Sequence, residues 1–226
     1  MKKIIFLFLT ISVFTEMSYS QKVDNTFIKL FSVDTSKNII KVSSSNIWTY
    51  HFSLEEVLKY FPNYDTAKIS FYSPHVSMET GEVEPKEPDD LNEFFPKKCF
   101  CFKYFDHYLI AYSLYKMKTP KNGVEETYYL IIVDNTFHIT DKKIICITVF
   151  GGMDYVLESL INPQNEKLFI IDCTHGKSIN ANFELITVED KKFKIIHTID
   201  RKLDGSTDNI EGYLNRLGWK DEFFLK

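Results

Sequence analysis

Residues 98–150 constrain the fold of this 226-residue chain more than any other stretch. Short runs of alternating apolar and polar side chains are separated there by tight polar turns, among them Asp106-His107, Asn122-Gly123 and Asp134-Asn135. Alternation with a period of two is typical of β-strands, and Asn-Gly accepts the positive φ values of a hairpin turn. The stretch therefore predicts an antiparallel meander with strands at 98–105, 108–117, 127–133, 136–140 and 143–150.

Similar runs predict strands on both sides of this stretch. In the segment 47–52, for example, Trp48, Tyr50 and Phe52 alternate with smaller or polar residues. The expected strands lie at 26–33, 38–43, 47–52, 67–72, 167–173, 182–189 and 193–199. The chain is thus predicted to be mainly β, and the pattern leaves open whether the meander forms an open sheet, a barrel or a partial propeller-like sheet.

Two or three short helices are expected to accompany the sheet. Ser53 and Glu56 form a capping-box pattern at the start of one helix, with an apolar stripe of Leu54, Val57, Leu58 and Phe61 that we assign to the core rather than to a partner-binding face. Asp208 is expected to cap a last helix that ends at Gly218, with Glu211 as its capping-box partner. Residues 153–161 fit a short helix, with a strand as the alternative.

The first twenty residues are predicted to be a secretory signal peptide. Lys2 and Lys3 precede an apolar run at 4–14, which is shorter than the roughly 20 residues that span a bilayer, and Ser20 offers a small residue at a cleavage site. We therefore expect cleavage after about Ser20 and an exported protein, periplasmic or secreted, with a single β-rich domain at 21–226. No later segment is apolar enough to predict a transmembrane helix.

Four cysteines follow the predicted signal peptide, and all lie in strand-like runs: Cys99, Cys101, Cys146 and Cys173. Cys99 and Cys101 are two residues apart and are expected to share one face of a strand, so they are poorly placed to bond each other. An oxidising compartment permits one disulfide, and buried free thiols are the alternative. The spacing does not fit a zinc site, and no metal ligand set is predicted.

An acidic stretch at 79–93 is the most unusual segment in composition. It holds seven acids against one lysine together with Pro85 and Pro88, which predicts an exposed loop. The loop could hold calcium or contact a basic partner, but its acid spacing fits no known calcium loop. The formal net charge of −4 argues against nucleic acid as a partner.

Motifs of enzymes and cofactors are not found in the sequence. The chain has no P-loop, no Gly-x-Gly-x-x-Gly, no Gly-x-Ser-x-Gly and no His-Glu-x-x-His, so no cofactor and no catalytic residue is assigned. Asp172, Cys173 and His175 lie together at the end of a strand-like run and carry the alternative prediction of a periplasmic hydrolase near Asp172 and His175. A strand end that runs into a turn explains the same residues without catalysis.

Aromatic residues offer a candidate binding surface. Tyr108, Tyr112, Tyr115, Tyr128 and Tyr129 could form a flat exposed surface that binds a sugar or a protein, although ordinary packing in the core and on the sheet is the favoured explanation. Together with the acidic stretch, the candidate binding residues are Tyr108, Tyr112, Glu82, Glu84, Asp89 and Asp90.

The strand rhythm of residues 105–200, as in YYLIIVDNTFHITDKKI and FELITVEDKKFKII, resembles that of small uncharacterised exported all-β proteins of Gram-negative bacteria. The resemblance implies a β-fold and an exported location, and it transfers no active site. The sequence as a whole favours a non-enzymatic binding protein of the bacterial cell envelope, with another envelope protein or a glycan as its ligand.

Overall fold

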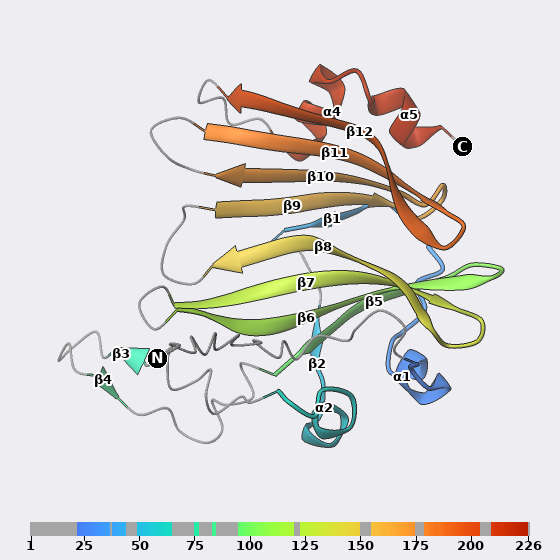
Figure 1. Cartoon of the computed structure of the whole chain (residues 1–226), viewed down its shortest axis with the longest axis vertical. Coiled ribbons are helices and arrows are strands. Elements are labelled where there is room, and N and C mark those ends of the chain that lie inside the picture. Colours follow the sequence, from blue (N-terminus) through green and yellow to red (C-terminus); the bar gives the residue numbers. More distant parts are fainter. Residues whose placement is uncertain are drawn as a thin grey trace, which may run out of the picture.

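The chain forms a mainly β structure built on one open antiparallel sheet (Figure 1). The computed structural model describes residues 22–36, 38–43, 49–64, 75–76, 83–84, 95–119, 123–149, 155–174, 179–203 and 209–225. Ten strands form the main sheet, which follows the order β12-β11-β10-β9-β8-β7-β6-β5-β2, with β1 paired to β9. The predicted meander is confirmed, and the sheet is open.

The main sheet follows the chain from one strand to the next. Its strands are β1 Ile40–Val42, β2 Tyr50–His51, β5 Lys97–Lys103, β6 His107–Thr119, β7 Gly123–Asp134, β8 Ile139–Val149, β9 Tyr155–Asn162, β10 Lys167–Thr174, β11 Ile179–Glu189 and β12 Lys192–Leu203. A separate pair consists of β3 His75–Val76 and β4 Val83–Glu84. The helices of the described residues are α1 Asn25–Lys29, α2 Leu54–Tyr60, α4 Ile210–Arg216 and α5 Lys220–Phe224.

The strands β8 and β9 pair at one position and then diverge, and this divergence lets the sheet curl. The register joins β8 to β9 only at Ile147 and Leu157, whereas β1 takes the edge of β9 from Ser159 to Ile161. The first residues of β8 instead contact the start of β12, where Asp141 Oδ2 accepts a hydrogen bond of 2.7 Å from the Phe193 amide. The strands β8 to β12 therefore curl around a shared inner face.

Two-sided burial explains why the central strands are apolar throughout. In β7, Leu130 and Ile132 face a core between the two halves of the sheet, while Tyr129, Ile131 and Val133 face the opposite side. Side chains of a strand alternate between its two faces, so a strand buried on both faces needs apolar residues at every position. We call the shared cluster the inner core; it includes Val42, Phe100, Phe102, Leu109, Leu130, Ile132, Ile145, Leu157, Ile161, Leu168, Ile170 and Ile186.

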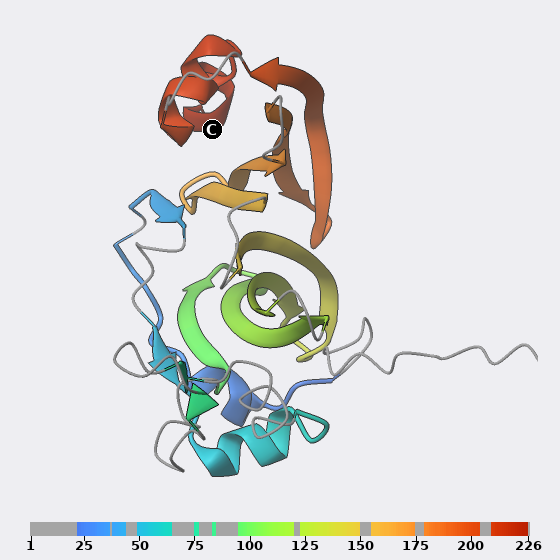
Figure 2. The ribbon, with the colours of Figure 1, turned by 90° about the vertical axis from the view of Figure 1, so that its left-hand side faces the viewer.

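The helices cover the two outer faces of the sheet (Figure 2). Phe27 of α1, together with Phe61 at the end of α2, belongs to the cluster that covers Tyr112 of β6. Phe223 of α5 and Tyr213 of α4 belong to the cluster that covers the outer face of β9 to β11. The C-terminal segment thus packs on the sheet as helix α5.

Three sequence predictions of secondary structure are wrong. The strand expected at 26–33 is replaced by α1, because the Asp24 side chain caps that helix and accepts a hydrogen bond of 2.9 Å from the Phe27 amide. The helix favoured at 153–161 is strand β9, which was the alternative, because β10 pairs with it along its whole length. The two strands expected at 136–140 and 143–150 are one strand, β8, preceded by a turn with Phe137 at φ 66°.

The capping box at Ser53 is confirmed, but its apolar stripe is only half buried. Ser53 and Glu56 exchange both hydrogen bonds, and Val57 and Phe61 lie in the core. Leu54 and Leu58 are 59% and 63% exposed, so the assignment of the whole stripe to the core is wrong for these two residues.

Helix α4 begins and ends close to the bounds predicted for the helix between Asp208 and Gly218. Its cap is Asn209, whose side chain accepts a hydrogen bond of 2.8 Å from the Gly212 amide, so Glu211 is not the partner in a capping box with Asp208. Asp208 lies outside the described residues. Gly218 ends the helix with φ 74°, a left-handed conformation that glycine adopts at little cost. The strand expected at 67–72 lies outside the described residues.

Candidate functional site

The tyrosines of the predicted aromatic surface are mostly buried. Tyr112 is 0% exposed, and Tyr115, Tyr128 and Tyr129 are buried as well, since the inner core and the α1–α2 layer cover the two faces of β6 and β7. The prediction that these four side chains form an exposed surface is therefore wrong. Tyr108 is partly buried against the same layer and stays a candidate.

The acidic half of that predicted surface is not placed by the structure. Glu82, Asp89 and Asp90 lie outside the described residues. Glu84 is described only through its backbone, in β4, where it pairs with His75 of β3. Contact of the acidic stretch with a partner or with calcium stays a prediction.

Asp172 and Cys173 point to opposite faces of β10. Cys173 packs in the outer cluster with Phe169 and Phe183, while Asp172 lines a groove on the inner face. Burial raises the pKa of the Cys173 thiol to about 11, so it is protonated near neutral pH and is a poor nucleophile. His175 lies outside the described residues, and a hydrolase that uses Asp172 and His175 stays a prediction.

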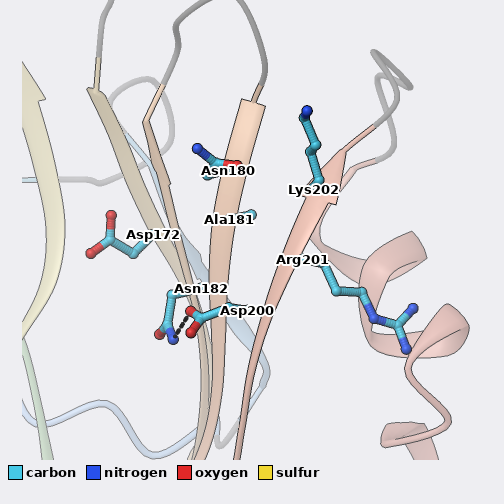
Figure 3. A pocket seen from close by; sticks show the side chains of 7 residues that line it. All are labelled: Asp172, Asn180, Ala181, Asn182, Asp200, Arg201 and Lys202. Carbon is cyan, nitrogen blue, oxygen red and sulfur yellow. Dashed lines mark hydrogen bonds between the residues drawn. The ribbon is translucent and has the colours of Figure 1, made fainter.

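The candidate site is a groove across β8 to β12, made of two adjoining cavities that share Asp172 and Asn182. The first cavity measures about 380 Å³ and the second about 310 Å³, within the range of small-ligand sites. The first is lined by Asp172, Asn180, Ala181, Asn182, Asp200, Arg201 and Lys202 (Figure 3). The second is lined by Lys142, Lys143, Ile144, Ile147, Leu157, Ile170, Asp172, Asn182 and Glu184.

A row of polar side chains crosses three strands in the first cavity. Asp172, Asn182 and Asp200 stand opposite one another in the register of β10, β11 and β12, so their side chains share the groove face. Asn182 Nδ2 donates hydrogen bonds to Asp200 Oδ1 at 2.8 Å and to Thr198 Oγ1 at 3.3 Å, which orients the amide. We call Asp172, Asn182 and Asp200 the polar row. Figure 3 shows Arg201 pointing away from this row, toward the helices.

The second cavity places an apolar surface beside the polar row. Ile147, Leu157 and Ile170 line it where β8 parts from β9. Lys143 of β8 crosses to Glu184 of β11 with an N–O distance of 2.6 Å. Two strands lie between β8 and β11 in the sheet order, so this ion pair shows how far the sheet curls.

All four cysteines are free thiols, and no metal site is found among the described residues. A β-bulge between Lys98 and Phe100 turns Cys99 toward the inner core, whereas Cys101 faces the α1–α2 layer. The prediction that Cys99 and Cys101 share one face is therefore wrong. Burial raises the pKa of Cys101 and of Cys146 to about 12, which keeps both thiols protonated.

Sequence reasoning missed the polar row except for Asp172. The sequence NFEL at 182–185 carried a signal, because Asn182 and Glu184 alternate with Phe183 and Leu185 and so predict one polar face. Nothing in that alternation indicates which neighbouring strand shares the face. The three residues form a row because β10, β11 and β12 pair in this register.

Helices of the described residues are all too short and too polar to cross a membrane. Comparison of the chain with protein-family models, with curated proteins and with solved structures found no match.

Proposed function

We propose that this chain is an exported, non-enzymatic binding protein of the bacterial cell envelope, and that the groove holds its ligand, a glycan or a segment of another envelope protein. The observation that carries the proposal is the in-register polar row beside the apolar surface of the second cavity. Concave sites with an apolar lining and a few oriented polar groups are typical of ligand binding. The signal-peptide pattern at residues 1–20 supports export.

The chemistry of the groove supports binding rather than catalysis. Asn182 is held by two hydrogen bonds, and Glu184 is engaged by Lys143. The one thiol next to the row, that of Cys173, lies on the opposite face of β10 and is protonated. The groove thus offers oriented donors and acceptors, and among the described residues no nucleophile with a base beside it lines the groove.

Capture from an envelope extract tests the proposal. Residues 21–226 are immobilised, and the retained protein and carbohydrate are compared with those retained by Asn182→Ala. We expect the unsubstituted chain to retain a component that Asn182→Ala loses, because the alanine removes one donor and one acceptor from the polar row.

Glu189→Gln is the matched control. Glu189 is an exposed residue at the end of the same strand and lines neither cavity. The control should retain the same component as the unsubstituted chain. Equal retention by all three proteins, or no retained component, would refute binding in the groove, provided that circular dichroism shows each variant to be folded.

A further inference from the structure

We infer that the ligand of the groove is a neutral oligosaccharide whose sugar rings lie across the strands along the polar row. The inference rests on the proposed function and names the ligand class. It follows from the edges of the strands, from the side chains and charges on the groove face and from the apolar residues beside the row.

The strand edges disfavour an extended peptide. A peptide that adds to a sheet takes its affinity from main-chain hydrogen bonds to an open edge. β10 pairs with β9 and with β11 along all of Lys167–Thr174, and β11 pairs with β12 as well as with β10. The strands that carry Asp172 and Asn182 thus have no open edge, so these two residues must recognise a ligand through their side chains. β12, which carries Asp200, is the last strand in the sheet order, and the peptide probes of the unfolding experiment address its outer edge.

The side chains of the row suit hydroxyl groups. A carboxylate oxygen accepts more than one hydrogen bond, so Asp172 and Asp200 can each accept from a ligand hydroxyl, Asp200 at the Oδ2 that Asn182 does not contact. Asn182 directs both Nδ2 hydrogens to Asp200 and Thr198, so its Oδ1 is the atom that can accept from a hydroxyl in the middle of the row. Neighbouring strands are about 4.8 Å apart, so the row extends over about 10 Å, the length of roughly two linked sugar rings.

The charges of the row disfavour an anionic ligand. Asp172 and Asp200 would lie beside any phosphate, sulfate or uronate bound along it, and like charges at such distances repel. Lys143 is engaged with Glu184 at 2.6 Å, and Arg201 points away from the row. Lys202 is the remaining cation that lines the first cavity, and Lys142, which lines the second, has its Nζ 3.9 Å from the centre of the Tyr129 ring. The polar row therefore disfavours an anionic ligand, and its side chains suit the hydroxyls of a neutral oligosaccharide.

The apolar surface of the second cavity completes the match. Ile147, Leu157 and Ile170 lie beside Asp172, which lines both cavities. A sugar ring presents C–H groups on its faces and hydroxyls around its edge. Leu157 and Ile170 are 7% and 3% exposed and belong to the inner core, so a ring can pack mainly on the partly exposed Ile147 while its hydroxyls reach Asp172 and Asn182.

Thermal unfolding tests the inference with defined probes. Residues 21–226 are melted with neutral tetrasaccharides (of glucose and of N-acetylglucosamine), with a uronic acid tetrasaccharide and with a pool of linear peptides. We expect one neutral tetrasaccharide to raise the melting temperature by several degrees and the anionic probe and the peptides to leave it unchanged, because a ligand of the folded state alone stabilises it.

Variants of the row locate the binding. Asn182→Ala and the exposed-site variant Asp200→Asn should each weaken binding of that tetrasaccharide by about tenfold, the loss of one good hydrogen bond. Glu189→Gln should bind as the unsubstituted chain does. Asp200→Asn keeps the size of the side chain and guards against a folding defect in Asn182→Ala.

The outcomes separate the inference from the proposed function. Binding of the uronic acid probe or of a peptide that Asn182→Ala abolishes would overturn the neutral glycan and leave the groove as the site. A neutral glycan that binds all variants equally would overturn both. A flat response to every probe overturns the inference, and the capture experiment then decides whether the proposed function stands.

Discussion

His107 Nε2 lies 2.9 Å from Glu166 Oε2, and this contact joins the start of β6 to the turn between β9 and β10. His107 Nδ1 lies 2.9 Å from Asp106 Oδ1, and the imidazole stacks on Tyr104. The side chain of His107 is buried and Glu166 is largely covered, so water screens this contact little, whereas the Asp106 side chain is half exposed. The contact holds the two halves of the sheet together on one side of the inner core.

This contact predicts a pH-dependent stability. Burial lowers the pKa of His107, but Glu166 and Asp106 outweigh it and hold the pKa above 6.5. A raised pKa in the folded state contributes stability below the unfolded value near 6.5, and this contribution is lost as the pH rises through the folded value. Denaturant unfolding between about pH 6 and pH 8 should therefore show a falling free energy of unfolding that His107→Gln lacks.

His138→Gln is the control, because His138 is half exposed and lies on β8's preceding turn. It should keep the pH dependence of the unsubstituted protein. If His107→Gln also kept that dependence, the contact with Glu166 would not be its source.

Lys97 and Glu126 form a buried ion pair, and we expect the loss of one partner to lower the free energy of unfolding strongly. Glu126 is 3% exposed, Lys97 Nζ lies 3.1 Å from its Oε1, and Ser113 Oγ donates to the same oxygen at 2.7 Å. Lys97→Met leaves the carboxylate buried with one partner fewer, which should lower the free energy of unfolding by about 3–5 kcal/mol. Adding Glu126→Gln should recover most of that loss.

Denaturant unfolding of the two single variants and the double variant measures the coupling between these residues. Lys98→Met is an informative comparison, because the Lys98–Glu56 pair is less buried than the Lys97–Glu126 pair. This substitution should lower the free energy of unfolding by less than Lys97→Met does. Losses that simply add in the Lys97 and Glu126 double variant would contradict a coupled pair.

The sequence predicted the meander because its information is local. Apolar runs in β6, β7 and β10, the alternation in β11 and the polar turns between them define strands without reference to the rest of the chain. The Ser53 capping box is local in the same way, and the structure shows both of its hydrogen bonds. Such elements follow from the residues that form them.

Of the wrong predictions, one was decided by a local cap that the strand pattern hid, and the others by distant contacts. Residues 26–33 alternate over a window too short to separate strand from helix, and the cap from Asp24 decides for the helix. Residues 153–161 have apolar residues at both spacings, and pairing with β10 decides for a strand. The sequence pattern allows Tyr112 on a surface or in the core, with packing favoured, and the helix layer that covers Tyr112 places it in the core.

The candidate site was beyond the sequence for a related reason. Asp172, Asn182 and Asp200 come from three strands, and only the register of those strands brings them into one row. Lys143 reaches Glu184 because the sheet curls, and the curl depends on the parting of β8 from β9. The sequence indicates that each of these residues is polar, but it does not indicate that they share one face of the sheet.

Two adjacent phenylalanines of α5 predict how much the C-terminal helix contributes to stability. Phe223 is 0% exposed and Phe224 is 46% exposed. Asn162 Nδ2 donates to the Phe223 carbonyl at 3.0 Å, which fixes the helix on the β9–β10 turn. Phe223→Ala should lower the free energy of unfolding by about 3–5 kcal/mol, and Phe224→Ala by less than about 1 kcal/mol.

Denaturant unfolding of both variants gives the comparison, with the unsubstituted chain as reference. The pair is a matched test, since both remove the same atoms from neighbouring positions of one helix. Equal losses would mean that α5 does not pack on the sheet through Phe223.

The four thiols give a prediction that separates the two cysteine alternatives. The structure holds Cys99, Cys101, Cys146 and Cys173 as free thiols, and burial raises the pKa of each. Because the thiolate is the reactive form, the native protein should react slowly with a thiol reagent at about pH 8. Unfolding in denaturant without a reductant should then expose all four thiols, counted with the same reagent. Fewer than four would show that a disulfide forms in the protein, and peptide mapping of the missing pair would identify the two strands that must approach each other.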